Sequence, residues 1–153
     1  MFDAIKQFLD ELSAGSSNAD SYHQTDPRLA AVVLLVHAVR IDGLILPAEQ
    51  EMLDRLILER FGLNEDEREK LVGEAERRDL EAVDLYGFTS VLKRTLDEEG
   101  RNRLVKMLWQ IVYADRHLHE FEDNLVWRVA ELLGVSSRDR IRLRKEIEDE
   151  AGL

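Results

Sequence analysis

The chain has 153 residues, of which 44% are apolar and 35% charged, a composition that indicates a globular domain and excludes an intrinsically disordered one. Lys and Arg number 21 against 32 Asp and Glu, and the net charge of −11 opposes binding to nucleic acid and favours cations or basic partners. The absence of cysteine excludes disulfides and thiolate chemistry. Because the sequence also shows no signal peptide and no apolar run of membrane-spanning length, we expect a cytoplasmic protein without direct membrane insertion.

The first part of the chain separates from the rest by composition. Apolar residues at helical spacing predict a short amphipathic helix over residues 1–12, and the small polar residues 13–26 predict a flexible linker. Residues 27–153 form the predicted helical domain. The amphipathic helix has three potential docking sites: the core of this domain, a second copy in a homodimer, or a partner protein. The stripe consists of Phe2, Ile5, Phe8, Leu9 and Leu12.

Helix-start and helix-stop signals divide the domain into seven further helices, so the predicted fold is an all-α compact bundle of about seven to eight helices. The expected helices cover residues 27–41, 47–61, 64–77, 85–96, 97–115, 120–133 and 136 onward. The expected N-caps are Asp26, Asn64, Asp97 and Ser136, with Gly62 and Gly134 as C-terminal stops.

The pattern of apolar residues predicts which helix faces are buried. Residues 29–41 are apolar almost all round, which indicates a central helix. In the helix over residues 120–133, Phe121, Leu125, Val129 and Leu132 are expected to point inward. In the last helix, Ile141 and Ile147 are expected to do the same. Its basic run is expected to be solvated and paired with acids at i,i+4 spacing; the run consists of Arg138, Arg140, Arg142, Arg144 and Lys145, and the pairs are Arg142–Glu146, Arg144–Glu148 and Lys145–Asp149.

Two segments place one Asp and one Glu around a short connection between helices. Asp42 and Glu49 surround the first connection, and Asp115 and Glu122 surround the second; both members are displaced by 73 residues (115 − 42 and 122 − 49). The sequence therefore predicts two pseudo-symmetric helix–loop–helix hairpins from an internal repeat. The second loop differs, because Arg116 replaces Gly43.

Residues 34–49 (LLVHAVRIDGLILPAE) and 108–122 (LWQIVYADRHLHEFE) resemble the TerB-like, tellurite-resistance family. A similar domain occurs at the N-terminus of some membrane-anchored DnaJ-type co-chaperones. The resemblance covers about residues 27–145 and implies an all-α bundle. It also implies a cation site built from the acidic motifs, a role in tellurite-type stress resistance, membrane-associated partners, and no established enzyme activity.

The residues themselves leave three interpretations of the acidic hairpins open. The carboxylates could be structural clips, because a first-turn carboxylate is stabilised by the helix dipole. They could bind a divalent cation such as Ca, Mn, Mg or Zn, which one loop alone is too poor in ligands to hold tightly. They could instead present an acidic face to a basic or membrane-associated protein partner. The candidate metal ligands are Asp42, Glu49, Asp115, Glu122, Glu120 and His119.

The other candidate sites lack the residues that a complete metal or catalytic site needs. His117 and His119 with Asp115 offer ligand types for Zn²⁺ or Ni²⁺, without a further motif to complete the site. His37 is expected to be a core or edge histidine bonded to a carbonyl rather than a catalytic base, because no nucleophile motif accompanies it. Trp109 and Trp127 are expected to pack at the core or its edge. We therefore predict a non-enzymatic protein that has no catalytic residues.

Overall fold

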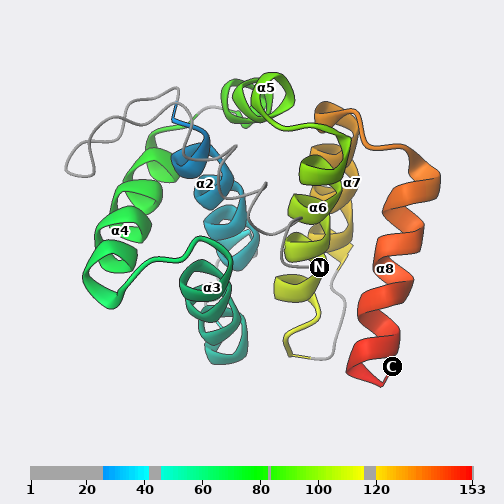
Figure 1. Ribbon diagram of the computed structural model, residues 1–153. Coiled ribbons are helices and arrows are strands. Elements are labelled where there is room, and N and C mark those ends of the chain that lie inside the picture. Colours follow the sequence, from blue (N-terminus) through cyan, green and yellow to red (C-terminus); the bar gives the residue numbers. More distant parts are fainter. Residues whose placement is uncertain (1–25, 42–45, 83, 116–119, 153) are drawn as a thin grey trace.

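The computed structural model describes residues 26–41, 46–82, 84–115 and 120–152, and within these ranges it contains seven helices and no strand (Figure 1). The all-α prediction is confirmed, whereas the predicted N-terminal helix and nearly all of the predicted linker lie outside the described residues. The helices are α2 (Pro27–Arg40), α3 (Pro47–Arg60), α4 (Glu65–Glu81), α5 (Tyr86–Thr95), α6 (Glu98–Val112), α7 (Glu120–Leu133) and α8 (Ser137–Ala151).

Helix ends fall where the capping signals place them. Asp26 accepts a hydrogen bond from the Arg28 amide at 2.9 Å, and Asn64 forms a reciprocal capping box with Glu67. Asp97 and Ser136 cap α6 and α8 in the same way. Gly62 and Gly134 have φ values of 64° and 79°, the left-handed conformation that ends a helix cheaply only at glycine. Helix α4 runs four residues beyond its expected end at Arg77.

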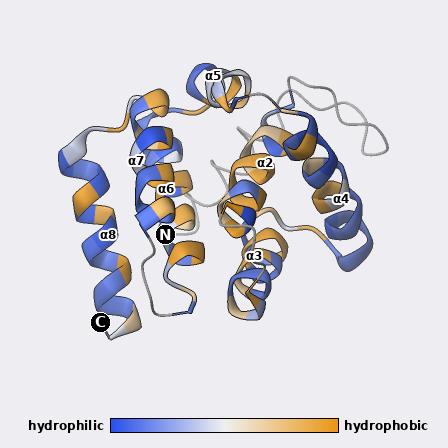
Figure 2. Cartoon of the chain, turned by 180° about the vertical axis from the view of Figure 1, so that it is seen from behind, coloured by the Kyte–Doolittle hydropathy of each residue, from blue (hydrophilic) through white to orange (hydrophobic). Residues whose placement is uncertain are grey.

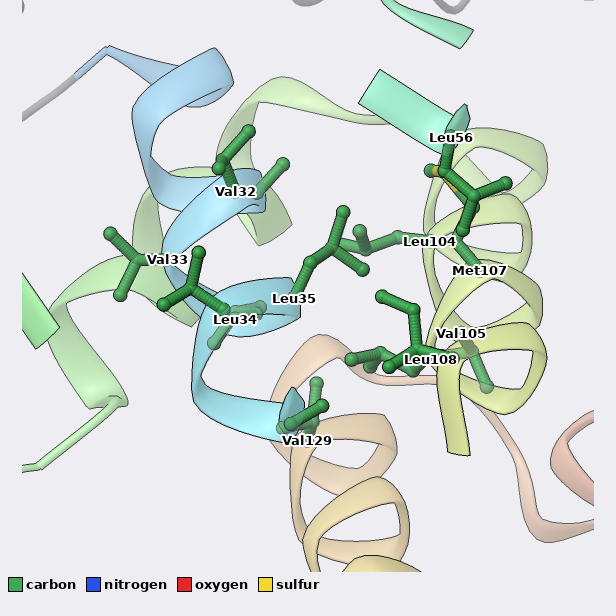
Figure 3. Packing of buried hydrophobic residues seen from close by; sticks show 14 of the residues in the cluster. Val32, Val33, Leu34, Leu35, Leu56, Leu104, Val105, Met107, Leu108 and Val129 are labelled. Atoms are coloured by element: carbon green, nitrogen blue, oxygen red, sulfur yellow. The ribbon is translucent and has the colours of Figure 1, made fainter. Parts of the chain in front are cut away.

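Helix α2 is the centre of the molecule. Its residues 29–36 are all at most 2% exposed, because α3, α4, α5 and α6 all contact it. In Figure 3, Leu35 of α2 points toward Leu104 and Leu108 of α6, and Leu56 of α3 lies against Met107. This surrounding packing explains why the helix is apolar on every side.

The other helices form two groups around α2 and α6. Helices α2, α3 and α4 contact one another, as do α6, α7 and α8, and the two groups meet through α2–α6 and α3–α6 contacts. Helix α5 lies across one end, where it touches α2 and α7 (Figure 1). Figure 2 shows that the outer helices α4 and α8 are largely hydrophilic, as expected for helices that bury one narrow face.

Two predicted inward-facing residues are exposed instead. Phe121 of α7 is 66% exposed and Ile141 of α8 is 46% exposed. The inner face of α7 is turned by about one residue from the predicted stripe, so that Val126 and Leu133 are buried beside Leu125 and Val129. Helix α8 buries Leu143 together with Ile147. Among the described residues, no helix is both long and apolar enough to cross a membrane.

Candidate functional site

Two glutamates occupy corresponding positions in the two predicted hairpins. Glu49 is the third residue of α3, and Glu122 is the third residue of α7. Each is only 1% exposed, which makes them two of the four polar or charged residues buried among the described ones; Asp26 and Thr89 are the others. A carboxylate is costly to remove from water unless its surroundings compensate the charge. Each of the two hairpins therefore buries a carboxylate at the same helix position.

Helix α7 inverts the normal order of burial at this point. Phe121 is 66% exposed, while its neighbour Glu122 is 1% exposed. Turning the helix the other way would bury the aromatic ring and release the carboxylate. Burying a phenylalanine side chain contributes about 1.5–3 kcal/mol. The observed orientation forgoes this contribution at Phe121 and buries Val126 and Leu133 on the same face as Glu122.

The start of each helix offsets part of the cost of burying the charge of its glutamate. The N-terminal amides of a helix lack intrahelical partners, and the helix dipole favours negative charge there. Leu46, the N-cap of α3, forms no side-chain cap hydrogen bond, and Glu49 is the acidic residue of the first turn. Helix α7 has three acids in its first turn, Glu120, Glu122 and Asp123. Helix α4 also has three acids in its first turn, so the burial of Glu122 rather than the number of acids distinguishes α7.

The remaining predicted ligands differ in exposure, and only some of them lie among the described residues. Asp115 is half-buried in the turn after α6, and Glu120 is exposed at the start of α7. Asp42, His117 and His119 lie outside the described residues, so the structure does not test their prediction. Within the described parts of the chain, no group of three or more His, Asp and Glu side chains is arranged to hold a metal ion. A cation site at the hairpins would therefore need ligands from residues 42–45 or 116–119.

The helix ends that carry the two loops lie close to one another. His37 and Ile41, at the end of α2, line the same groove as Phe121 and Leu125, near the start of α7. Helix α3 of the first hairpin also contacts α6 of the second. The groove thus joins the end of α2 to the start of α7.

Arg144 of α8 braces the second hairpin. Its Nε atom donates hydrogen bonds of 2.9 Å to the Tyr113 hydroxyl and to Glu148 Oε1, and the Tyr113 hydroxyl donates to Glu148 Oε1 at 2.7 Å. Its Nη1 atom lies 3.6 Å from Asp123 Oδ1 of α7, and the guanidinium lies over the Trp109 ring. One side chain thus links α6, α7 and α8.

These contacts shift the pKa values of the groups that share them. Burial and the hydrogen bond to Glu148 raise the pKa of Tyr113. The hydrogen bonds from Tyr113 and Arg144 lower the pKa of Glu148. Burial opposes the charge of Arg144, but the hydrogen bond to Glu148 still raises its pKa. The network therefore favours a neutral tyrosine and an ion pair at neutral pH.

The sequence pattern identified part of this network. Of the three predicted i,i+4 pairs, Arg142–Glu146 and Arg144–Glu148 form ion pairs of 2.8 and 2.9 Å. Arg144 also bonds the Tyr113 hydroxyl, a partner that the sequence did not predict. The signal that could have identified Tyr113 is its i,i+4 spacing from Trp109, which places both rings on one face of α6.

His37 pairs with a carboxylate rather than with the predicted carbonyl. Its Nδ1 atom lies 2.7 Å from Asp79 Oδ1 of α4, and the Asp79 side chain is 8% exposed. This pair joins the end of α2 to the end of α4. The prediction that Trp109 and Trp127 pack at the core or its edge is confirmed, because they are 1% and 47% exposed.

The described residues thus form an all-α bundle in which α3 and α7 each bury a glutamate in their first turn. A family model described as "Tellurite resistance protein TerB" matches residues 28–145, and the chain belongs to this TerB family. The matched region contains α3 to α7 entire, α2 without its first residue, and more than half of α8. Comparisons with curated proteins and with solved structures give no match.

Proposed function

We propose that this TerB family member acts without catalysis in a metal or oxyanion stress response of the tellurite type, and that its acidic hairpins bind a divalent cation. Family membership supports the association with tellurite resistance and the non-catalytic role. The observation that carries the cation site is the equal and nearly complete burial of Glu49 and Glu122 at the third position of α3 and α7.

The chemistry of these residues favours a hard cation. Carboxylate oxygens are the preferred ligands of Ca²⁺, Mg²⁺ and Mn²⁺, and a bound cation would offset the cost of burying two negative charges. Asp115 and Glu120 flank the second connection in the sequence, and Asp42 at the first connection and His119 in the second are the remaining candidate ligands. The site would therefore combine buried carboxylates from the helix starts with ligands from the two loops.

Thermal unfolding with added metal tests the proposal. At one hundred times its dissociation constant, a cation that binds only the folded state stabilises it by ~2.7 kcal/mol, which raises the melting temperature. We expect this rise for at least one of Ca²⁺, Mg²⁺, Mn²⁺ and Zn²⁺ with the wild-type chain. The rise should disappear in the double variant Glu49→Gln with Glu122→Gln, which removes both charges and changes little in shape.

A matched control separates site binding from general charge effects. Glu51 of α3 and Glu131 of α7 are exposed residues of the same two helices, and replacing both by Gln changes the net charge equally. The metal-dependent rise should persist in this control. A rise that survives in the hairpin variant, or no rise with any of the four metals, would show that the glutamates are structural clips.

The alternative function is an interaction module that presents an acidic face to a basic or membrane-associated partner. It is favoured by the first turn of α4, where Glu65, Asp66 and Glu67 follow one another on an outer helix, and by the net charge of −11. A basic partner held by this face should dissociate with rising salt. Its binding should be insensitive to Glu49→Gln and Glu122→Gln, which distinguishes it from the cation proposal.

A further inference from the structure

An apolar groove lies where the end of α2, the segment before α5 and the start of α7 meet. Its volume is about 420 Å³, and its apolar lining includes Ile41, Leu85, Leu125 and Leu132. Tyr86 and Phe121 stand at the same groove and are 65% and 66% exposed, although large aromatic rings normally seek burial. An open apolar surface of this kind is typical of a docking site.

Both carboxylates of the groove accept hydrogen bonds from neighbouring groups. His37 pairs with Asp79 at 2.7 Å, and Asp84 Oδ1 accepts a hydrogen bond from the Tyr86 amide at 3.0 Å. Neither carboxylate therefore needs a polar ligand for its charge. The groove therefore offers a ligand apolar area, two aromatic side chains, and the polar side chains of Asn124 and Arg128.

We propose that the N-terminal segment, residues 2–12 of the same chain, docks in this groove as an amphipathic helix. Its sequence places five large apolar side chains on one stripe, with Asp3, Gln7 and Asp10 among the residues of the opposite face. An isolated helix of this length is marginal in water, and most of its stability must come from packing its apolar face. Docking would therefore bury the apolar stripe of the segment and cover the exposed apolar lining of the groove.

The length of the connecting chain matches the distance to be covered. The groove residues His37 and Ile41 follow the start of α2 by 10 and 14 positions, which corresponds to ~15–20 Å along a helix. Residues 13–25 are small and polar, and a flexible linker of this length has an average end-to-end distance of ~18–22 Å. A tether whose average length equals the span gives the highest effective concentration, in the millimolar range. A free helix from another protein would have to compete with that concentration.

Paramagnetic relaxation enhancement tests the docking on the full chain. Because the protein contains no cysteine, the single change Asp10→Cys gives one attachment point for a nitroxide on the polar face of the segment. We expect the amide signals of Tyr86 and Arg128, which line the groove, to be broadened several-fold more than that of Ile141 on α8. Equal broadening at the groove and on α8, or none at either, would overturn the proposal.

Variants on both sides of the contact identify its chemistry. Phe8→Asp places a charge in the apolar stripe and should abolish the broadening at the groove, whereas Gln7→Asp adds the same charge on the polar face and should preserve it. Phe121→Ser should weaken the effect, whereas Ile141→Ser removes a comparably exposed apolar residue outside the groove and should not. If Phe8→Asp leaves the broadening unchanged, the stripe is not the docking surface.

A mixed sample identifies the occupant. Spin-labelled chains without ¹⁵N are combined with ¹⁵N-labelled chains that carry no nitroxide, so that only contacts between molecules broaden the observed signals. Docking within one chain predicts no broadening at the groove in this mixture. Broadening that appears in the mixture would assign the groove to a second copy and overturn the proposal.

Discussion

Tyr113→Phe tests the contact that holds α8 against the second hairpin. The hydroxyl donates to Glu148 Oε1 at 2.7 Å and accepts from Arg144 Nε at 2.9 Å, and Tyr113 is only 7% exposed. A hydrogen bond to a charged group contributes ~1.5–3 kcal/mol to stability. Part of this is retained, because Arg144 and Glu148 keep their own contact and their side chains are 37% and 30% exposed to water. We therefore expect a loss of about 1–2 kcal/mol in the free energy of unfolding.

Urea unfolding at neutral pH measures this loss directly, and the melting temperature should fall by ~2–8 °C for a domain of this size. Tyr86→Phe is the matched control, because Tyr86 is 65% exposed and the same chemical change should alter stability by less than ~0.5 kcal/mol. Equal stabilities of the two variants would refute the energetic role of the network.

The pH dependence of the difference gives an independent check. The folded-state pKa of Glu148 is lowered, so its contribution is present above the unfolded pKa and is lost as the pH falls toward the folded value. The folded-state pKa of Tyr113 is raised, so its contribution is present below the unfolded value near 10 and is lost as the pH rises through the folded value. The stability gap between wild type and Tyr113→Phe should therefore be widest between these limits. A gap that stays constant down to pH 3 would contradict the assignment.

Two further substitutions test the core and one turn. Leu35→Ala should cost about 2–5 kcal/mol in urea unfolding, because Leu35 is fully buried between α2 and α6, whereas Leu80→Ala, at 71% exposure, should change stability by less than ~0.5 kcal/mol. Gly134→Ala should destabilise by ~1–2 kcal/mol because of its φ of 79°, while Gly73→Ala inside α4, where a Cβ meets nothing within 4 Å, should stabilise by ~0.5–1 kcal/mol. Similar costs for the two members of either pair would show that burial or backbone conformation is not the cause.

Helix positions could be predicted from the sequence because their signals are local. Asp26, Asn64, Asp97 and Ser136 act within three residues of themselves, and a cap is recognisable without knowing what the helix packs against. The burial of α2 on all sides was equally predictable, since a helix without a polar face has no stable exposed orientation. These features fixed the fold class.

The orientation of the later helices depends on long-range contacts that apolar spacing does not encode. Ile141 satisfies the apolar period of α8, but the hydrogen bond of Arg144 to Tyr113 at the end of α6 and its ion pair with Asp123 of α7 favour an orientation that buries Leu143 instead. Nor does spacing identify Asp79 as the partner of His37, because these residues are 42 positions apart. The missed features all join separate helices.

The orientation of α7 connects the two proposals physically. The same rotation that places Glu122 inside places Phe121 outside, where it becomes part of the groove. If a cation compensates the buried carboxylate, its binding favours the orientation that also keeps the groove open. If the N-terminal segment covers Phe121, its docking recovers part of the apolar burial that this orientation forgoes. Each interaction would then reduce the free-energy cost of the other, and this reciprocity follows from linkage.

The coupling can be measured as the change in cation affinity between wild type and Phe8→Asp. Equal affinities would mean that α7 holds its orientation without help from the segment, even if both sites exist.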